Sequence, residues 1–457
     1  MLDWNTIISF KRFGQKHTGQ DARSDFRRDY DKIIFLSGFR RLQNKTQVFP
    51  LPGNVFVHNR LTHSLEVSSV GRSIGHIVGE KIAKKYKDSL TATSRKFYKY
   101  DLEDVVASAC LAHDLGNPAF GHSGEKAISN YFKTHADATI DESTLQSYFS
   151  ENEWHDVTAF EGNANALRLL THQFNGRVIG GHRLMFLTLA SIIKYPCHSG
   201  QVQKEFLSRK KYGYFQSEKE IFHEIMEEFS LNQVEIGQRH PFVYLVEAAD
   251  DICYRIIDME DAHRIGIISL EEISRLFLQL IAEIVNSVNF DAIQNRFHQI
   301  SDSNEAIAYL RAKCILHLVE KVALIFMDHD SDILSGNFNA SLLDVCEAEI
   351  KSLKEINSIS IRKIYNHRSV IEIELAGYTV MSELLHHFVS AALCQRRTDV
   401  QDKILQLVPQ QFQTFDQSSS YVRVMSILDF VSGMTDGYAT ELYRKIKGIE
   451  IPSHKGF

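Results

Sequence analysis

The stretch VVASACLAHDLGNPAFGHSGEKAI, residues 105–128, decides the fold. Its first eight residues are apolar or small, which is typical of a helix buried on most sides. The segment GNP at 116–118 then breaks the helix, because Pro lacks a backbone N–H and restricts the residue before it. Apolar spacing resumes after the turn. The stretch therefore predicts two helices joined by a tight turn, with His113 and Asp114 at the end of the first helix.

Apolar residues recur at spacings of three and four along most of the chain, whereas alternating patterns are rare and short. Only seven prolines interrupt this periodicity. The pattern predicts an all-α fold, a helical core with additional C-terminal helices. The clearest predicted helical stretches are 61–83, 104–112, 242–257, 270–288, 307–326 and 378–393.

The polar stretch 84–99 is predicted to be a helix end followed by a surface loop. The polar stretch 328–339 is predicted to be a loop. We place the core in residues 1–330. We expect residues 331–457 to form a C-terminal helical part that does not fold independently.

Composition excludes several classes of protein. The chain has 457 residues, 44% of them hydrophobic, so there is enough apolar surface to form a core and intrinsic disorder is excluded. With 57 acidic and 51 basic residues, the net charge of 51 − 57 = −6 excludes a globally basic nucleic-acid coat. No apolar run reaches the roughly 18 residues needed to span a bilayer, and we expect no membrane contact.

The N-terminus MLDWNTIISFKRFGQ does not have the pattern of a secretory signal. The six cysteines are scattered without a CxxC pair, which favours reduced thiols and disfavours a structural zinc site. We therefore expect a cytoplasmic protein.

Histidine is abundant, with 21 residues, and its positions relative to carboxylates are informative. His113 and Asp114 are adjacent, and an Asp buried without a partner is costly, which favours a metal ion or a salt bridge. His122 and Glu125 are three residues apart at the start of the next helix, so the carboxylate can orient the imidazole for acid–base chemistry. Helix capping is the alternative for this pair. His63 lies early in another predicted helix. Considered alone, a histidine in a helix is more often a core or surface residue than a metal ligand.

The segment HPFVYLVEAADDICYRIIDMEDA places Asp250, Tyr254 and Asp258 on one stripe of a mostly apolar helix. Carboxylates on a largely buried helix need a cation, a ligand or salt-bridge partners on other helices. The last of these remains an alternative to a binding site.

Two imidazoles and two carboxylates, His63, His113, Asp114 and Asp250, form a ligand set that suits an octahedral divalent metal with open water positions. Mn, Fe, Mg and Ni are all compatible with such a set. The set lacks the thiolates of a structural zinc site.

The order H…HD…D resembles the HD-domain metal-dependent phosphohydrolases, and longer segments resemble the bacterial deoxyguanosine triphosphate triphosphohydrolases (dGTPases). The resemblance runs from about residue 23 to about residue 447, nearly the whole chain. The segments that carry it are FRRLQNKTQVFPLPGNVFVHNRLTHSLEV (39–67), AHDLGNPAFGHSGE (112–125), FEGNANALRLL (160–170), KYP (194–196), EAADDICY (247–254) and SGMTDGYATELY (432–443).

This resemblance implies hydrolysis of a dNTP at the α-phosphorus to a deoxynucleoside and inorganic tripolyphosphate, with dGTP favoured. It implies a helical HD-domain core in which the four residues named above bind the metal. His122, paired with Glu125, matches the family's catalytic histidine. It would either activate the attacking water or protonate the leaving 5′ oxygen.

The resemblance also implies residues that bind the substrate. Arg60, Lys194 and Tyr195 match positions that contact the triphosphate. Gln47 and Asp258 match residues that bind the sugar 3′-hydroxyl.

Tyr254 resembles the family's tyrosine against the deoxyribose, where close packing under C2′ would exclude a 2′-hydroxyl. Glu374 matches a position near the guanine, and Arg423 is a further candidate there. A surface carboxylate is the alternative for Glu374.

Family members are usually ring-like homo-oligomers, often hexamers, and some bind single-stranded DNA. The basic tracts 81–99 and 209–211 are candidates for such a DNA contact. Two other functions stay open on the same scaffold. One is another HD-type nucleotide phosphohydrolase, a monophosphatase or cyclic-nucleotide phosphodiesterase. The other is a non-catalytic nucleotide or DNA sensor.

Overall fold

The computed structural model describes residues 2–14, 24–50, 57–177, 180–233, 236–414 and 418–450. Residues 51–56 of the dGTPase-like stretch 39–67 lie outside the described residues. The all-α prediction is confirmed, since helices dominate and each sheet has two very short strands.

The helices are α1 (Asp25–Ile34), α2 (Ser37–Arg41), α3 (Arg60–Lys85), α4 (Ala92–Tyr100), α5 (Leu102–Ala112), α6 (Gly121–Thr134), α7 (Glu151–Thr158), α8 (Gly162–Thr171), α9 (Phe186–Ile192), α10 (Lys219–Glu228), α11 (Val243–Arg264), α12 (Leu270–Ile284), α13 (Ser287–Gln299), α14 (Ser303–Asp328), α15 (Asp330–Ser335), α16 (Leu342–Glu349), α17 (Lys351–Ile359), α18 (Arg368–Leu393), α19 (Asp399–Gln406), α20 (Ser420–Ser432) and α21 (Asp436–Ile446). The strands are β1 (Thr139–Ile140), β2 (Ser143–Thr144), β3 (Asn232–Gln233) and β4 (Ile236–Gly237). Strand β1 pairs with β2, and β3 pairs with β4, both antiparallel.

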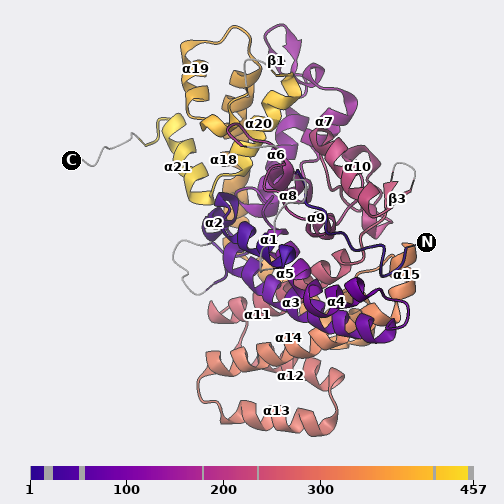
Figure 1. Ribbon diagram of the computed structural model, residues 1–457. Helices are drawn as coiled ribbons and strands as arrows, with labels where there is room; N and C mark the ends of the chain where they lie inside the picture. Colours follow the sequence, from indigo (N-terminus) through magenta and orange to yellow (C-terminus); the bar gives the residue numbers. More distant parts are fainter. Residues whose placement is uncertain are drawn as a thin grey trace, which may run out of the picture.

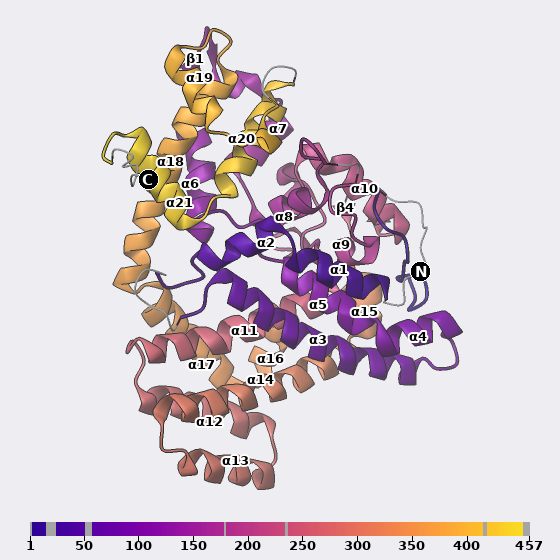
Figure 2. The same ribbon diagram turned by 60° about the vertical axis from the view of Figure 1, so that its left-hand side comes forward.

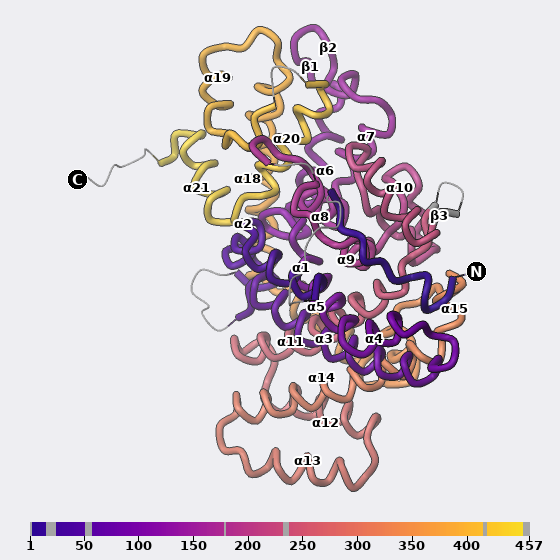
Figure 3. The backbone as a smooth tube through the Cα atoms, in the orientation of Figure 1, coloured from indigo at the N-terminus to yellow at the C-terminus, as the bar shows by residue number. Residues whose placement is uncertain are grey.

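The molecule is elongated. Helices α12 and α13 lie at one end, and α19 lies with β1 at the other (Figures 1 and 2). Helices α3, α5 and α11 occupy the middle, and the chain trace in Figure 3 shows α14 crossing beside them. Segments far apart in the sequence therefore meet at the centre, where α11 and α14 both pack on α3.

The apolar core has two clusters, and α18 contributes to both. The larger cluster contains α3, α5, α11 and α14 and extends to Val370 at the start of α18. The smaller cluster joins α6 and α7 to the later part of α18 and to α20 and α21. The C-terminal helices thus share a core with α6, although the boundary at residue 330 and the folding of each part stay predictions.

Three glycines allow α3 to pack very closely on its neighbours. Gly71, Gly75 and Gly79 recur every four residues and so lie on one face of α3. A Cβ on Gly71 would lie 2.4 Å from the sulfur of Cys110 in α5, and one on Gly79 would lie 2.1 Å from the carbonyl of Tyr98. Close packing of α3 against α5 sets the distance between His63 on one helix and His113 at the end of the other.

Two predicted loops are wrong in part, because each contains a helix. The basic stretch 84–99 includes most of α4, where Phe97 and Tyr98 are buried while Lys96 and Arg95 face solvent. The stretch 328–339 includes α15, and buried Asp330 accepts hydrogen bonds from Lys85 and Tyr86. Amphipathic helices this short offer only one or two apolar residues as a sequence signal.

None of the helices in the described part of the chain is both long and apolar enough to cross a membrane. The six cysteines are all buried and free.

Candidate active site

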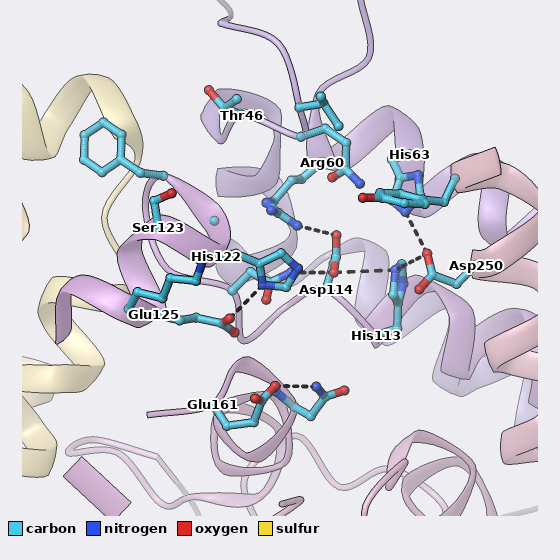
Figure 4. Close-up of a pocket in the computed structure, with 18 of the residues that line it drawn as sticks. Thr46, Arg60, His63, His113, Asp114, His122, Ser123, Glu125, Glu161 and Asp250 are labelled. Atoms are coloured by element: carbon cyan, nitrogen blue, oxygen red, sulfur yellow. Dashed lines mark hydrogen bonds and ion pairs between the residues drawn. The ribbon is translucent and has the colours of Figure 1, made fainter. Parts of the chain in front are cut away.

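A cavity of about 500 Å³ lies where α3, the turn between α5 and α6, α11 and α18 meet. Figure 4 shows His122 and Glu125 on one side of it and His63, His113 and Asp250 on the other. The structure thus brings together residues that are more than 180 positions apart in the chain.

A capping box positions the first wall of the cavity. The side chain of Asn59 accepts a hydrogen bond from the backbone N–H of Thr62, and the Thr62 hydroxyl accepts one from the backbone N–H of Asn59. Helix α3 therefore begins at Arg60, as this motif favours. Arg60 and His63, three residues apart in the first turns, both line the cavity.

Ligand atoms of His63, His113 and Asp114 lie within 4.8 Å of one another, which fits a bound metal ion. Asp250 completes the cluster, with Oδ1 3.1 Å from Nε2 of His63 and 3.4 Å from Nε2 of His113. Nδ1 of His113 donates to the carbonyl of Cys110 at 2.6 Å, which leaves Nε2 for a ligand. That buried Nε2 makes no hydrogen bond among the described residues and has only ion-pair contacts, at 3.4 Å to Asp250 and 3.5 Å to Asp114, as expected for a metal-binding atom.

The charges of the cluster favour ionised carboxylates. Burial alone would raise the pKa of Asp114, but His113 and Arg60 lower it to about 2. Burial likewise opposes ionisation of Asp250, yet the two histidines hold its pKa well below the usual range. The same carboxylates raise the pKa of His113 to about 9 against the effect of burial. The cluster attracts positive charge strongly, and a divalent cation fits it.

His122 and Glu125 form the second functional pair. Nδ1 of His122 lies 2.7 Å from Oε2 of Glu125, and the other carboxylate oxygen accepts the backbone N–H of Gly162 at 2.8 Å. Burial would raise the pKa of Glu125, but the hydrogen bond and charge of His122 lower it. The Glu125 side chain is buried, whereas the His122 ring is 70% exposed. A fixed carboxylate thus orients an imidazole whose Nε2 stays available to the cavity.

A strained turn brings His122 to the cavity. Phe120 and Gly121 both have left-handed backbone conformations, with φ of 62° and 57°. The left-handed conformation favours glycine at position 121, where a Cβ would also lie 2.5 Å from the Arg60 guanidinium and would displace it. Asp436, at the start of α21, holds this turn by accepting the backbone N–H of Phe120 at 2.9 Å and that of Thr46 at 2.8 Å.

We expect Asp436→Ala to lower both stability and turnover. The change leaves two backbone N–H groups without their acceptor, at a cost of about 1–3 kcal/mol each. It also loosens the turn before His122, and a misplaced reacting group costs up to about 10²-fold in rate. Urea unfolding and steady-state kinetics measure both effects. Asp399→Ala, at the exposed first position of α19, is the control and is expected to leave turnover unchanged.

Each cation predicted to contact the triphosphate lines the cavity and is paired with a carboxylate. Arg60 donates to Asp114 at 2.7 Å, and Nζ of Lys194 lies 3.1 Å from Glu247. Burial would lower the pKa of Lys194, but Glu247 raises it, so the amine stays charged. Tyr195 lines the cavity beside Lys194.

Of the three residues predicted to contact the sugar, two line the cavity and one does not. Gln47 and Tyr254 line the cavity, and a buried side-chain oxygen of Gln47 has no hydrogen-bond partner among the described residues. Asp258 does not line the cavity but accepts a hydrogen bond at 2.8 Å from the hydroxyl of Tyr365, which does. Burial raises the pKa of Asp258 to about 8, so this carboxyl keeps a proton at neutral pH. Its contact with a 3′-hydroxyl stays a prediction.

Glu374 of α18 lines the cavity, as a base-contacting position requires. Arg423 lies in α20, outside the cavity lining, and donates to the carbonyl of Ala392. Its role near the base also stays a prediction.

Three further residues at the cavity were not predicted from the sequence. Lys211 pairs with Glu161 at 2.9 Å, and burial together with the charge of Glu125 raises the pKa of Glu161. Tyr365 stacks on Tyr254 with ring centroids 5.2 Å apart. Tyr365 ends the π-helical turn η6 (Ser360–Tyr365), a geometry that periodicity does not indicate. Glu161 lies in FEGNANALRLL (160–170), a segment of the family resemblance that could have identified it as a site residue.

Comparisons with known proteins agree with this geometry. The HD domain family matches residues 60–183, and the phosphohydrolase-associated domain matches residues 340–445. The chain is 36% identical to a deoxyguanosinetriphosphate triphosphohydrolase-like protein of Synechocystis sp. over 98% of this chain and 100% of the relative. It is 36% identical to a protein of the same description from Pseudomonas aeruginosa, over 99% and 100%. It is 30% identical to a deoxyguanosinetriphosphate triphosphohydrolase of Serratia proteamaculans, over 98% and 99%.

Proposed function

The chain belongs to the deoxyguanosinetriphosphate triphosphohydrolase family of HD-domain proteins, and we propose that it hydrolyses dNTPs, dGTP above all, to a deoxynucleoside and inorganic tripolyphosphate. One observation carries this proposal. A single cavity combines a cluster of histidines and carboxylates, an oriented His–Glu pair and two cations, Arg60 and Lys194, suited to a triphosphate.

In this proposal His63, His113, Asp114 and Asp250 hold a divalent cation of the Mn, Mg, Fe or Ni type. Such an ion, when bound, polarises a phosphoryl oxygen and lowers the pKa of bound water. Two observations support the fit, namely that Nε2 of His113 is buried without a hydrogen bond among the described residues, and that the carboxylates within 3.5 Å of it are strongly ionised.

The remaining steps are assigned to the protein's own side chains. Arg60, Lys194 and Tyr195 bind the triphosphate, and the first two neutralise its charge. His122 either takes a proton from the attacking water or gives one to the leaving 5′ oxygen, and Glu125 keeps its ring in place.

The sugar and base contacts complete the proposal. Tyr254, stiffened by its stacking on Tyr365, packs under the deoxyribose and leaves no room for a 2′-hydroxyl. Gln47 and Asp258 bind the 3′-hydroxyl, and Glu374 contacts the base. The homo-oligomer and the contact with single-stranded DNA stay predictions from the resemblance.

Product analysis tests the activity directly. The purified protein is incubated with each of the four dNTPs and with GTP, in Mn²⁺ or Mg²⁺, and products are separated by anion exchange. We expect deoxynucleoside plus tripolyphosphate from dGTP, and no product from GTP. The Asp250→Ala variant serves as the control for contaminating phosphatases.

Other products would redirect the proposal. Tripolyphosphate from all four dNTPs would indicate a broader enzyme. If no single dNTP reacted, mixtures would be tested for activation by a second nucleotide. Orthophosphate from monophosphates, or a linear nucleotide from a cyclic one, would replace the proposal with another HD-type hydrolase.

A further inference from the structure

A second cationic pocket lies apart from the catalytic cavity. Arg41, at the end of α2, lines it together with Arg177 and His182, and Leu115, Phe174 and Phe412 supply apolar walls. None of its lining residues also lines the catalytic cavity. We call it the Arg41 pocket. It differs from the catalytic cavity in having no carboxylate among its lining residues in the described part of the chain.

The Arg41 guanidinium has no hydrogen bond or ion pair with any residue of the described ranges, although it is partly buried. Arginines that are fully buried among the described residues are matched by carboxylates. Arg12 pairs with Asp29 at 2.6 Å, and Arg239 pairs with Glu247 at 2.9 Å. Arg41 is half-buried and has no such carboxylate.

Arg177 does not balance the positive charge of Arg41 but adds to it. Its hydrogen-bonding contact in the pocket is with the ring of His182, at 2.6 Å to Nε2. Burial, the charge of Arg177 and that of Lys32 lower the pKa of His182 to about 4, so at neutral pH the ring is neutral and accepts a hydrogen bond from Arg177. Burial and the charge of Arg177 also lower the pKa of Arg41.

Two guanidiniums in one pocket without an anion are costly, because neither group loses its proton at physiological pH and both are partly desolvated. A small oxyanion relieves this cost. Planar guanidiniums match phosphate geometry with paired N–H donors, which makes phosphate the chemistry best suited to the pocket.

We propose that the Arg41 pocket binds a phosphate group, held between Arg41 and Arg177. An adjoining cavity of about 210 Å³ shares Arg41 and Phe412 with it and is walled by Phe430, Met434 and Tyr438. The pocket therefore accepts either free phosphate or the phosphoryl end of a small monoester, whose organic part lies in the adjoining cavity.

The test is the dependence of thermal stability on orthophosphate, titrated against chloride at constant ionic strength. A ligand that binds only the folded state raises the melting temperature by an amount that grows with the logarithm of 1 + [L]/Kd. We expect Arg41→Met to need at least tenfold more phosphate than the parent for the same rise in melting temperature. In chloride alone, the variant is expected to be at least as stable as the parent, because an unbalanced charge is gone.

Two controls separate this site from others. Arg40→Met changes the exposed neighbouring arginine of the same helix and is expected to change the phosphate concentration needed for that rise less than twofold. Lys194→Met removes a cation from the catalytic cavity. If Lys194→Met abolished the phosphate effect while Arg41→Met kept it, the effect would arise in the catalytic cavity and the proposal would be wrong.

Arg177→Met provides a second variant in case Arg41→Met does not fold, and circular dichroism checks the helical content of both. A parent protein with no phosphate effect would also overturn the proposal. The same titration with glycerol phosphate distinguishes a phosphate monoester from free phosphate as the ligand. Tighter binding than orthophosphate would indicate a monoester that uses the adjoining cavity, and equal or weaker binding would indicate free phosphate. Both results support the site.

Discussion

Replacement of Asp250 by alanine is expected to remove both the bound metal and the hydrolytic activity. Oδ1 of Asp250 lies within 3.4 Å of Nε2 of both His63 and His113, so the change deletes the carboxylate that, within the described ranges, contacts both imidazoles. Loss of residues that merely orient metal ligands lowers affinity or activity by about 10–100-fold. Loss of a ligand is expected to exceed that range.

Metal content by mass spectrometry and turnover of dGTP measure the two effects in the same preparations. Asp251→Asn is the matched control, because Asp251 is the next residue of α11 and does not line the cavity. It is expected to keep its metal. Unchanged metal stoichiometry in Asp250→Ala would remove Asp250 from the ligand set, even if activity were lost.

Much of this site could be predicted because its residues lie close together in sequence. His113 and Asp114 end a helix before a turn, and His122 and Glu125 begin the next helix with the spacing that pairs them. Helical periodicity and the break at the turn contain that information. The long helices α3, α11 and α14 were predictable for the same reason, since each repeats its apolar pattern over several turns.

Other features depend on tertiary packing and have no local signal. Lys211 and Tyr365 reach the cavity from an irregular segment and from a π-helical turn. Asp258 has the spacing of a cavity residue, yet it does not line the cavity and instead accepts a hydrogen bond from Tyr365, which does. The role of Asp436 depends on contact between residues more than 300 positions apart. Sequence patterns describe faces of helices, whereas these contacts depend on how the helices meet.

His122→Ala is expected to lower turnover by about 10²–10⁴-fold, the usual contribution of a general acid or base. Metal content is expected to stay unchanged, because His122 is not part of the His63–His113–Asp114 cluster. The exposed ring makes little contact with the core, so the substitution should not unfold the protein. His76→Ala is the matched control, since His76 is also exposed and paired with a glutamate, Glu103 at 2.8 Å, on the surface of α3.

Glu125→Gln separates orientation from chemistry in the same pair. The amide oxygen can still accept the backbone N–H of Gly162, so the turn is expected to hold. The amide nitrogen would face Nδ1 of His122, which can then no longer donate and must take the other tautomer. We expect kcat to fall while KM and metal content change little, because substrate is bound by other residues. Turnover at the parental rate in both His122→Ala and Glu125→Gln would refute acid–base catalysis by this pair.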